Sequence, residues 1–367
     1  MKRLSAILLC MTSVALAQTS VTKANFGKLP SGEEAQIFTV KNDAITLRLT
    51  TFGARVVSLE TRDKNGKMGG VVLGYDSVDN YVKDTKTYFG SVPGRYANRI
   101  AKGTFTLEGK TYHVPINNPP NSLHGGTEGF ERHNWRAKEI PNGVEFTLVS
   151  GDGDQDYPGA LTAHVRYTLE NNTVSIQYSA TTNAPTVVNL TNHAYFNLGG
   201  DGSPSILNEH LTIFADRYTP IDATSIPLGP IEPVAGTPFD FRTPHGIGSR
   251  IEEKNVQLQN GAGYDHNFVL NQSAGALHEA ARVHDMDTGR VLVVKTTEPG
   301  VQFYTGNFLD GTLPSRTGGT YARRSGLCLE TQHYPDSPNE PSYPSTELKP
   351  GDTYRSETTW TFSVENK

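Results

Sequence analysis

Two side chains suited to proton transfer lie far apart in the sequence, His193 and Glu330. Glu330 follows Leu-Cys-Leu at residues 327–329, a run typical of an interior strand. Burial raises the pKa of a carboxyl group toward the range in which it serves as a general base. We therefore predict Glu330 as a candidate base. A structural glutamate paired with an arginine is the alternative that the sequence leaves open.

The histidine lies in a stretch with an unusual alternation, residues 187–198. Alternate side chains of a β-strand point to opposite faces. Read as a strand, this stretch has one apolar face, consisting of Val188, Leu190, Ala194, Phe196 and Leu198. The other face is polar but uncharged, consisting of Asn189, Thr191, His193, Tyr195 and Asn197. Taken alone, the stretch fits a polar strand face slightly better than a substrate-binding row.

Polar residues also cluster near two turns. Residues 94–100 bring Asn98 and Arg99 close to a second arginine. A guanidinium group there would bind hydroxyls or a carboxylate, or form a structural salt bridge. His124 precedes two glycines, which would let the backbone approach a ligand closely.

Two further stretches place polar side chains within predicted strands. Asp265 stands beside an imidazole and an amide in residues 263–268. Gln302 and Tyr304 alternate with Val301 and Phe303. These positions are candidates for the wall of a binding site.

The sequence predicts neither a metal nor a cofactor. Four histidines are candidate ligands but show no metal-binding spacing, namely His124, His193, His266 and His333. The acidic run Asp152, Asp154 and Asp156 has the start of a calcium loop, but Tyr157 and Ala163 replace the required glycine and glutamate. We interpret it as a surface turn, with ion binding left open.

The elements that must position these residues are strands. Short alternating runs joined by turns predominate, for example at residues 39–49, 71–76 and the hairpin 104–113. No sustained 3.6-residue apolar period, internal repeat or low-complexity linker occurs in the mature chain. We predict an all-β protein, a large antiparallel β-sandwich that forms a single domain over residues 18–367.

The N-terminus has the features of a secretory signal peptide. A basic start, an apolar run over residues 4–16 and an Ala-Leu-Ala site predict cleavage after Ala17. We expect a periplasmic or secreted protein that is not in the membrane after cleavage. The mature chain keeps only Cys328, so it cannot form an internal disulfide. With a net charge of −5 and no basic patch, the sequence gives no electrostatic argument for nucleic-acid binding.

Six motifs, in this order, resemble the aldose 1-epimerase (mutarotase) family of the galactose mutarotase type. They are GRYANRIAKGTF at 94–105, NSLHGG at 121–126, NLTNHAYFNL at 189–198, GYDHNF at 263–268, VQFYTGNF at 301–308 and LETQHYPD at 329–336. The resemblance extends from about Phe38 onward. The signal peptide is the one departure, since the familiar members are cytoplasmic.

The resemblance implies a β-sandwich with an open sugar cleft and interconversion of the α- and β-anomers of free aldohexoses such as glucose and galactose. It implies Glu330 as base, His193 as acid and His124 as a second catalytic-site histidine. Further positions match residues that contact sugar hydroxyls, namely Asn98, Arg99, Tyr195, Asp265 and Gln302. The alternatives are a non-catalytic carbohydrate-binding β-sandwich and a relative acting on phosphorylated hexoses. The sequence sets neither the preferred aldose nor the oligomeric state.

Overall fold

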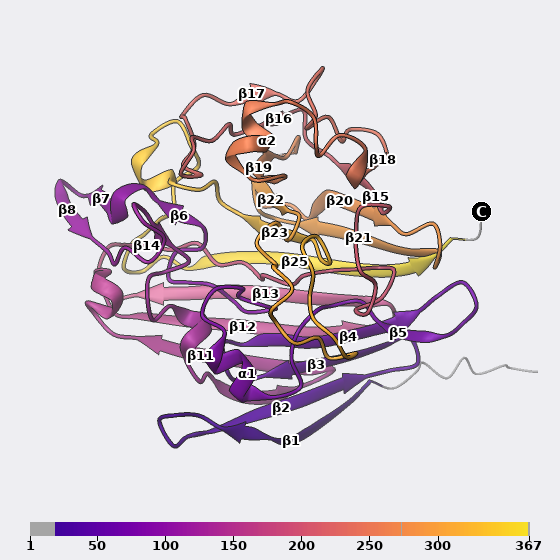
Figure 1. Ribbon diagram of the computed structural model, residues 1–367. Coiled ribbons are helices and arrows are strands. Elements are labelled where there is room, and N and C mark those ends of the chain that lie inside the picture. Colours follow the sequence, from indigo (N-terminus) through magenta and orange to yellow (C-terminus); the bar gives the residue numbers. More distant parts are fainter. Residues whose placement is uncertain (1–18, 273, 366–367) are drawn as a thin grey trace, which may run out of the picture.

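Antiparallel strands make up most of the chain (Figure 1). The computed structural model describes residues 19–272 and 274–365. The predicted signal peptide, residues 1–17, lies outside them. The first strands form a five-stranded sheet, β1 (Ser20–Lys28), β2 (Glu34–Lys41), β3 (Ile45–Thr50), β4 (Arg55–Arg62) and β5 (Met68–Gly70).

The largest sheet has nine strands and crosses the middle of Figure 1. In spatial order they are β10 (Arg136–Ile140), β11 (Gly143–Ser150), β12 (Leu161–Glu170), β13 (Thr173–Thr182), β25 (Tyr354–Val364), β21 (Arg290–Thr296), β20 (His278–His284), β15 (His210–Ile213) and β18 (His245–Gly246). The C-terminal strand β25 lies at its centre, so the sheet is complete only when the end of the chain has joined it.

A smaller five-stranded sheet carries much of the chemistry predicted above. Its strands are β17 (Glu232–Pro233), β16 (Arg217–Tyr218), β19 (Asp265–Val269), β22 (Gly300–Tyr304) and β23 (Cys328–Gln332). Val301, Phe303 and Leu329 join the hydrophobic core on one face. Because the strand period is two, Gln302 and Glu330, which are opposite each other in the ladder, must face the other way. This sheet therefore has one apolar and one polar face, both buried.

The remaining elements are short. Three two-stranded pairs join β6 (Arg99–Ile100) to β9 (Ser122–Leu123), β7 (Thr104–Leu107) to β8 (Lys110–His113), and β14 (Thr186–Val187) to β24 (Glu347–Leu348). The α-helices are α1 (Val78–Lys83) and α2 (Val256–Asn260), and the 3₁₀ turns are η1 (Ala101–Gly103), η2 (Phe130–Arg132), η3 (Asp154–Asp156), η4 (Ile247–Ser249) and η5 (Ser337–Asn339). Within the described ranges, no helix is long and apolar enough to cross a membrane.

One hydrophobic cluster joins the sheets. It runs from Phe38 in β2 to Phe362 in β25. Phe38 packs on Phe146 of the nine-stranded sheet, with ring centroids 6.1 Å apart, and Phe196 packs edge-on against Trp360 at 5.0 Å. Since the three sheets share one core, the predicted single-domain antiparallel sandwich is confirmed.

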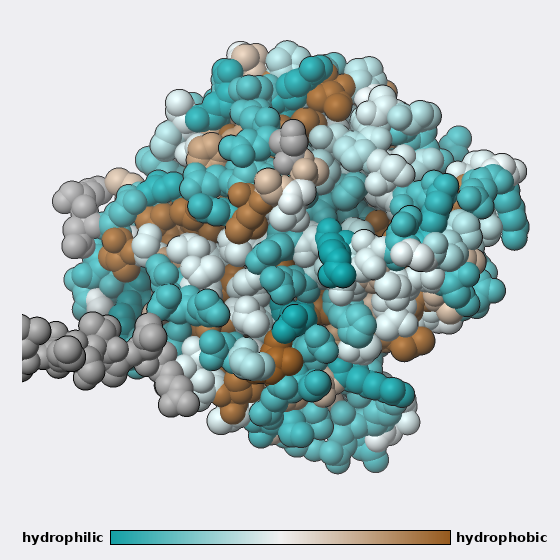
Figure 2. Space-filling view, turned by 180° about the vertical axis from the view of Figure 1, so that it is seen from behind, coloured by the Kyte–Doolittle hydropathy of each residue, from teal (hydrophilic) through white to brown (hydrophobic). Residues whose placement is uncertain are grey.

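The surface seen in Figure 2 carries hydrophobic residues in several small groups separated by hydrophilic ones. Large exposed hydrophobic side chains among the described residues include Ile116, Val149, Leu228, Val256, Leu277, Phe308 and Val364. Scattered exposed apolar residues are normal for a globular protein. Phe308 differs from the others because it lies at a cavity described below.

The stretch 187–198 is not the regular strand that its alternation predicts. Its apolar face is confirmed, because all five predicted residues join the core. Its backbone, however, changes partner every few residues, from Ala97 to Gly90 and Ser91, then to Leu73 and Leu327. A ladder needs one continuous neighbour. The stretch instead links separate segments at residues 71–73, 90–97 and 327, and all of its residues are buried.

Two other strand predictions need correction. Residues 39–49 form the end of β2 and the start of β3, because Asn42 turns the chain by accepting bonds from the backbone of Ala44 and Ile45. Residues 71–76 form only an isolated bridge, between Val72 and Phe196. The hairpin at 104–113 is confirmed as β7 and β8.

Candidate active site

A cavity of about 150 Å³ opens beside the polar face of the small sheet. Engineered cavities of about this volume admit a benzene ring, so a six-membered sugar ring is of fitting size. Its lining residues come from seven separate parts of the chain, Lys86, Thr87, Tyr88, Asn98, Arg99, Leu123, His124, His193, Tyr195, Asp265, Tyr304, Phe308 and Glu330. Seven of the eight predicted site residues are among them.

The predicted acid and base meet at this cavity. His193 Nε2 lies 3.7 Å from Glu330 Oε1, and both side chains are almost fully buried. Glu330 points from β23, while His193 is held by backbone hydrogen bonds to Gly90 and Ser91. Within the described ranges Glu330 forms no ion pair with an arginine or lysine, so the alternative of a structural salt bridge does not hold.

Burial governs the protonation of this pair. It lowers the pKa of His193 to about 3 and raises the pKa of Glu330 well above its usual range, where the nearby Asp265 carboxylate adds to the increase. Arg99 opposes that increase only in part. The imidazole is therefore neutral and the carboxyl group favours its protonated form.

His124 is held in one tautomer. Its ring Nδ1 accepts a hydrogen bond from the backbone N–H of Asn98 at 3.0 Å. The backbone N–H of His124 donates to the Asn98 carbonyl oxygen at 2.9 Å. The ring proton must then be on Nε2. Burial lowers the pKa of His124 well below its usual value, with His193 and Arg99 adding to the decrease. His124 thus presents a neutral N–H donor.

Both partners in this contact have left-handed backbone angles, with φ of 64° at Asn98 and 52° at His124. Non-glycine residues adopt this region rarely, and in such cases the surrounding structure holds them there. Asn98 Oδ1 accepts from the Arg99 N–H, and Asn98 Nδ2 approaches Gln332 Oε1 at 3.5 Å. The strained backbone thereby turns Asn98, Arg99 and His124 toward one cavity.

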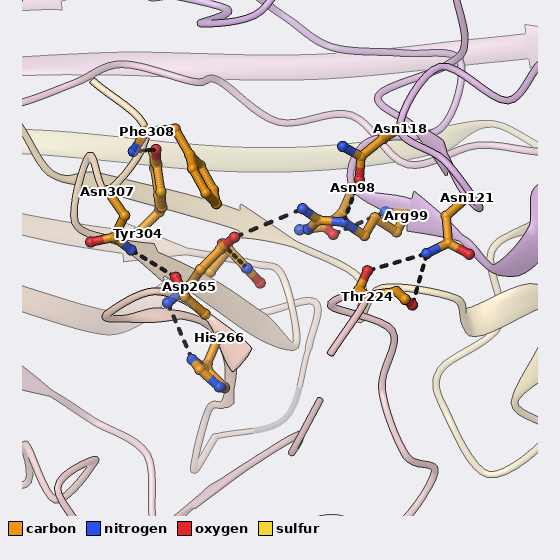
Figure 3. Close-up of polar contacts among 12 residues, drawn as sticks. Asn98, Arg99, Asn118, Asn121, Thr224, Asp265, His266, Tyr304, Asn307 and Phe308 are labelled. Carbon is orange, nitrogen blue, oxygen red and sulfur yellow. Dashed lines mark hydrogen bonds and ion pairs between the residues drawn. The ribbon is translucent and has the colours of Figure 1, made fainter. Parts of the chain in front are cut away.

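A second polar group in the site consists of Asp265, Gln302 and Arg99. Figure 3 shows Arg99 and Asp265 pointing toward each other. Gln302 Nε2 donates to Asp265 Oδ1 at 2.7 Å, and Arg99 Nη2 lies 3.9 Å from Asp265 Oδ2. Burial raises the pKa of Asp265, and Arg99 and Gln302 oppose this rise. Gln302 does not itself line the cavity, so it acts on the cavity by orienting Asp265.

His124, His193 and Glu330 place possible metal-ligand atoms within 4.8 Å of one another, although the histidines lack sequence spacing for a metal. A metal-bound histidine normally donates its other ring N–H to an acceptor. His124 does the reverse, because its Nδ1 accepts the Asn98 N–H and its Nε2 keeps the proton. This donor set does not fit a metal ion held by all three side chains.

The other histidines considered above lie elsewhere. His266 points to the opposite face of β19, where its Nδ1 accepts from the Asp265 N–H and its Nε2 lies 3.2 Å from Gln257 Oε1. His333 pairs with Glu298 at 2.6 Å. Neither lines the cavity.

Two sequence interpretations change. Gly125 does not make room for a ligand, because a Cβ there would lie 1.8 Å from the carbonyl oxygen of Gly94, so its role is close packing of two chain segments. Arg95 is structural, bonding to the carbonyl oxygens of Pro158 and Gly159. The motif at 94–100 thus has one structural arginine and one in the cavity.

The acidic run at 152–156 is a turn, as predicted. Asp152 accepts from the backbone N–H of Gly159 at 2.6 Å, and Asp154 accepts from the Ser150 hydroxyl at 2.6 Å. Arg95 also bonds to the carbonyl oxygen of Gly151. Local donors therefore occupy groups that a calcium ion would need.

Sequence reasoning identified Tyr195 but missed two other aromatic residues of the cavity, Tyr88 and Phe308. Tyr88 and Tyr195 lie nearly parallel to the His193 ring, at centroid distances of 5.8 and 5.1 Å. Tyr88 has no strand alternation around it, and its φ of 58° reflects a loop that the sequence did not indicate. Phe308 follows β22 directly and was within reach of the same alternation that identified Gln302.

The amino-acid sequence is similar to those of known proteins. The aldose 1-epimerase family model matches residues 36–361. The galactose mutarotase of Rattus norvegicus is 47% identical over 346 residues, covering 94% of this chain and 99% of that protein. The chain belongs to the aldose 1-epimerase family.

More distant relatives support the same family. The aldose 1-epimerase of Escherichia coli is 40% identical over 341 residues, covering 92% of this chain and 97% of that protein. The crystal structure of a GalM/aldose epimerase homologue from C. elegans has a TM-score of 0.81 at 33% identity, covering 88% of this chain and 97% of that one. The family and fold predictions are confirmed, and the chain is an isomerase of the mutarotase type. A non-catalytic sugar-binding protein is not favoured.

Replacing Asp265 by asparagine should move the basic limb of the pH profile of kcat/KM, where the pair loses its shared proton, to lower pH. The Asp265 charge raises the pKa of Glu330, so its removal favours the ionised carboxylate. The pH dependence of kcat/KM reports groups of the free enzyme. Gln302→Met is the control, because it keeps the Asp265 charge. A basic limb that stays in place or moves to higher pH in Asp265→Asn would contradict this electrostatic coupling.

Proposed function

We propose that Glu330 and His193 are the general base and general acid that open and close the ring of a free aldohexose bound in the cavity. The observation that supports this most directly is their approach to 3.7 Å at the wall of a sugar-sized cavity. The C1 hydroxyl and the ring oxygen are bonded to the same carbon. Because the two side chains are 3.7 Å apart, one can exchange a proton with the C1 hydroxyl while the other exchanges a proton with the ring oxygen of the same hemiacetal.

The chemistry needs two proton transfers. Glu330 takes the proton of the C1 hydroxyl while His193 protonates the ring oxygen, so the C1–ring-oxygen bond breaks and an aldehyde forms. Rotation about C1–C2 exposes the other face of the carbonyl. His193 then recovers the proton from the C5 hydroxyl and Glu330 returns its proton to the carbonyl oxygen. No atom is gained or lost, and each proton transfer contributes on the order of 10²–10⁴-fold.

The protonation preferences of the buried pair favour the opening step. After opening, the carboxyl group carries a proton and the imidazole is neutral. This is the state that burial favours at both groups. The two groups share one exchangeable proton, and the closed sugar is bound when that proton lies on His193. Pairs whose environments separate their pKa values are typical of acid–base sites.

The other cavity residues have binding roles in this proposal. His124 donates from Nε2 to a sugar oxygen, and Asp265 and Arg99 bind hydroxyls on the other side of the ring. Asn98 orients His124 through its backbone and Gln302 orients Asp265. Holding the ring in one pose converts a random encounter into a directed transfer. Tyr195 and Phe308 offer aromatic surface to the apolar faces of the sugar.

The substrate class follows from the relatives and the cavity. The similar proteins are named galactose mutarotase and aldose 1-epimerase, which supports free aldohexoses such as galactose and glucose as substrates. We further propose that the protein works in the periplasm or outside the cell. The basic start, apolar run and Ala-Leu-Ala site at residues 1–17 support export.

Glu330→Gln should abolish enzymatic mutarotation, with a loss of at least about 10²-fold in kcat, because glutamine cannot accept the C1 hydroxyl proton. The measurement is polarimetry on freshly dissolved α-D-glucose and α-D-galactose. Glu298→Gln is a matched control, since Glu298 is equally buried but binds His333 outside the cavity. Near wild-type turnover in Glu330→Gln would remove Glu330 as the base.

The same variant has a stability signature. Burial raises the pKa of Glu330 in the folded protein above its unfolded value, so its ionisation opposes folding as the pH rises through that interval. Glutamine cannot ionise and escapes this penalty. Urea denaturation at about pH 8 should find Glu330→Gln at least as stable as the wild type. Loss of activity together with loss of stability would point to a structural role.

His193→Asn should lower kcat by at least about 10²-fold while thermal melting changes little. Asparagine keeps a polar side chain at the site but cannot carry the transferable proton. His278→Asn serves as control because His278 is buried on β20, away from the cavity. If the melting temperature and the activity of His193→Asn fall in parallel, His193 is a structural residue.

Expression of the full chain in a Gram-negative host should yield a mature protein that begins at Gln18 and fractionates with the periplasm. Mass spectrometry of the intact protein reads the cleavage site directly. Replacing Ala17 by a bulky residue such as phenylalanine should block processing. A full-length cytoplasmic product from the unaltered chain would refute the export proposal and leave the chemistry untouched.

A further inference from the structure

Phe308 lies between the sugar-sized cavity and a second hollow on the surface. This second hollow, here called the outer groove, has a volume of about 500 Å³ and is lined by residues 307–311 together with Ala322 and Arg323. Among the described residues, Phe308 alone lines both the outer groove and the cavity that contains Glu330. One aromatic side chain therefore marks the boundary between the two spaces.

The residues on either side of Phe308 hold it in an exposed position. Asn307 and Leu309 are buried, at 6% and 1% exposure, whereas Phe308 is 64% exposed. The Asn307 amide donates to two carbonyl oxygens of the segment 261–264. The backbone N–H of Leu309 donates to the carbonyl oxygen of Gly306 at 3.2 Å, which closes a tight turn. Because both neighbours are anchored inward, the Phe308 side chain is directed outward.

Tyr304 holds both the backbone and the ring of Phe308. Its hydroxyl oxygen accepts the backbone N–H of Phe308 at 3.0 Å, a bond drawn in Figure 3. The two rings stack with their centroids 6.0 Å apart and their planes 24° from parallel. Tyr304 also packs edge-on against His193 at 6.4 Å and against Tyr195 at 5.9 Å. The exposed ring is thus connected to the catalytic pair through one buried aromatic residue.

The two spaces differ in what they can hold. The cavity of about 150 Å³ has room for one six-membered ring, so a second sugar ring must lie outside it. The outer groove is large enough for that second ring, and Asp310 and Arg323 give it groups that hydrogen-bond to hydroxyls. A disaccharide whose reducing ring lies beside Glu330 meets Phe308 on the way to this groove.

We propose that Phe308 is a specificity-determining residue that restricts the site to single aldose rings, by blocking the path from the cavity to the outer groove. This inference rests on the proposed function, because it requires the reacting ring to bind beside Glu330 and His193. Phe308 has no proton to transfer and takes no part in the chemical step. Its effect is on which sugars reach the catalytic pair, and therefore on the ratio of kcat/KM between sugars.

The test compares Phe308→Ala with Phe308→Tyr by polarimetry on freshly dissolved sugars. The sugars are D-glucose and two disaccharides with glucose at the reducing end, lactose (linked through O4) and melibiose (linked through O6). Alanine opens the path, so kcat/KM for at least one disaccharide should rise at least about tenfold, whereas kcat/KM for glucose should not rise. Tyrosine keeps the ring in place, so its values should match those of the wild type.

Opposite movement of the two kinds of sugar separates a steric block from a lost contact. Loss of aromatic contact alone would raise KM for every sugar, by roughly two- to tenfold. Val149→Ala is the matched control, because Val149 is 65% exposed but lies on β11 and lines neither space. It should leave all three values of kcat/KM unchanged.

Sugar binding can be measured without turnover. Isothermal titration of the wild type and Phe308→Ala with the same sugars should show tighter binding of at least one disaccharide by the variant. If the wild type does not mutarotate glucose, the proposed function fails, and these affinities still decide whether Phe308 blocks the groove.

Two outcomes would overturn the proposal. One is a folded Phe308→Ala variant in which neither disaccharide gains in kcat/KM or in affinity. The other is an equal gain in Phe308→Tyr, which would show that the ring does not form the block. Thermal melting checks that each variant is folded. Phe308→Ser, which also removes the ring and suits an exposed position, gives the same test if alanine lowers the melting temperature.

Discussion

Burial of an acid–base pair is the constraint on which this structure depends. A carboxyl group and an imidazole lie 3.7 Å apart with almost no contact with solvent. Both lose hydration in their charged forms, so the fold disfavours the charges that the closed-ring step needs. Stability and catalysis therefore oppose each other at Glu330 and His193. The fold keeps the pair buried, despite this cost in stability, because the elements around it are rigid.

The small five-stranded sheet supplies most of that rigidity. Its apolar face packs into the shared core through Phe303 and Leu329. This packing fixes the position of its strands relative to the other sheets. The opposite face then presents Asp265, Gln302 and Glu330 in a fixed pattern. Because the ladder pairs Gln302 directly with Glu330, the spacing of the polar groups is that of the sheet itself. Sites on strands are held more precisely than sites on loops.

The facing half of the site is built differently. Asn98 and His124 come from turns with left-handed backbone, held by two hydrogen bonds to each other. Arg95, three residues before Asn98, anchors this region by binding carbonyl oxygens of a distant turn. Its guanidinium group has no catalytic part, yet the direction of Arg99 and Asn98 depends on where that anchor holds the chain. Strain at a functional site persists where neighbouring structure overdetermines it.

Local patterns in the sequence were sufficient for several features. Alternation identified the apolar side of residues 187–198 and the polar positions of β22 and β23, since the two-residue period belongs to each strand alone. The same period puts Cys328 on the face of Glu330, but its contact with His193, 135 positions away, is not contained in that pattern. Resemblance to a family supplied the roles that spacing could not.

Only the tertiary structure decided which polar residues meet. Arg95 and Arg99 have the same side chain in one short motif, and only their neighbours make one structural and one part of the cavity. The stretch 187–198 has the pattern of a strand, but its hydrogen bonds go to several separate segments, so it is not a regular strand. The sequence by itself determined the strands and the chemical groups available. Hydrogen-bond partners, burial and the tautomer of each histidine depend on contacts between distant segments, which no local pattern contains.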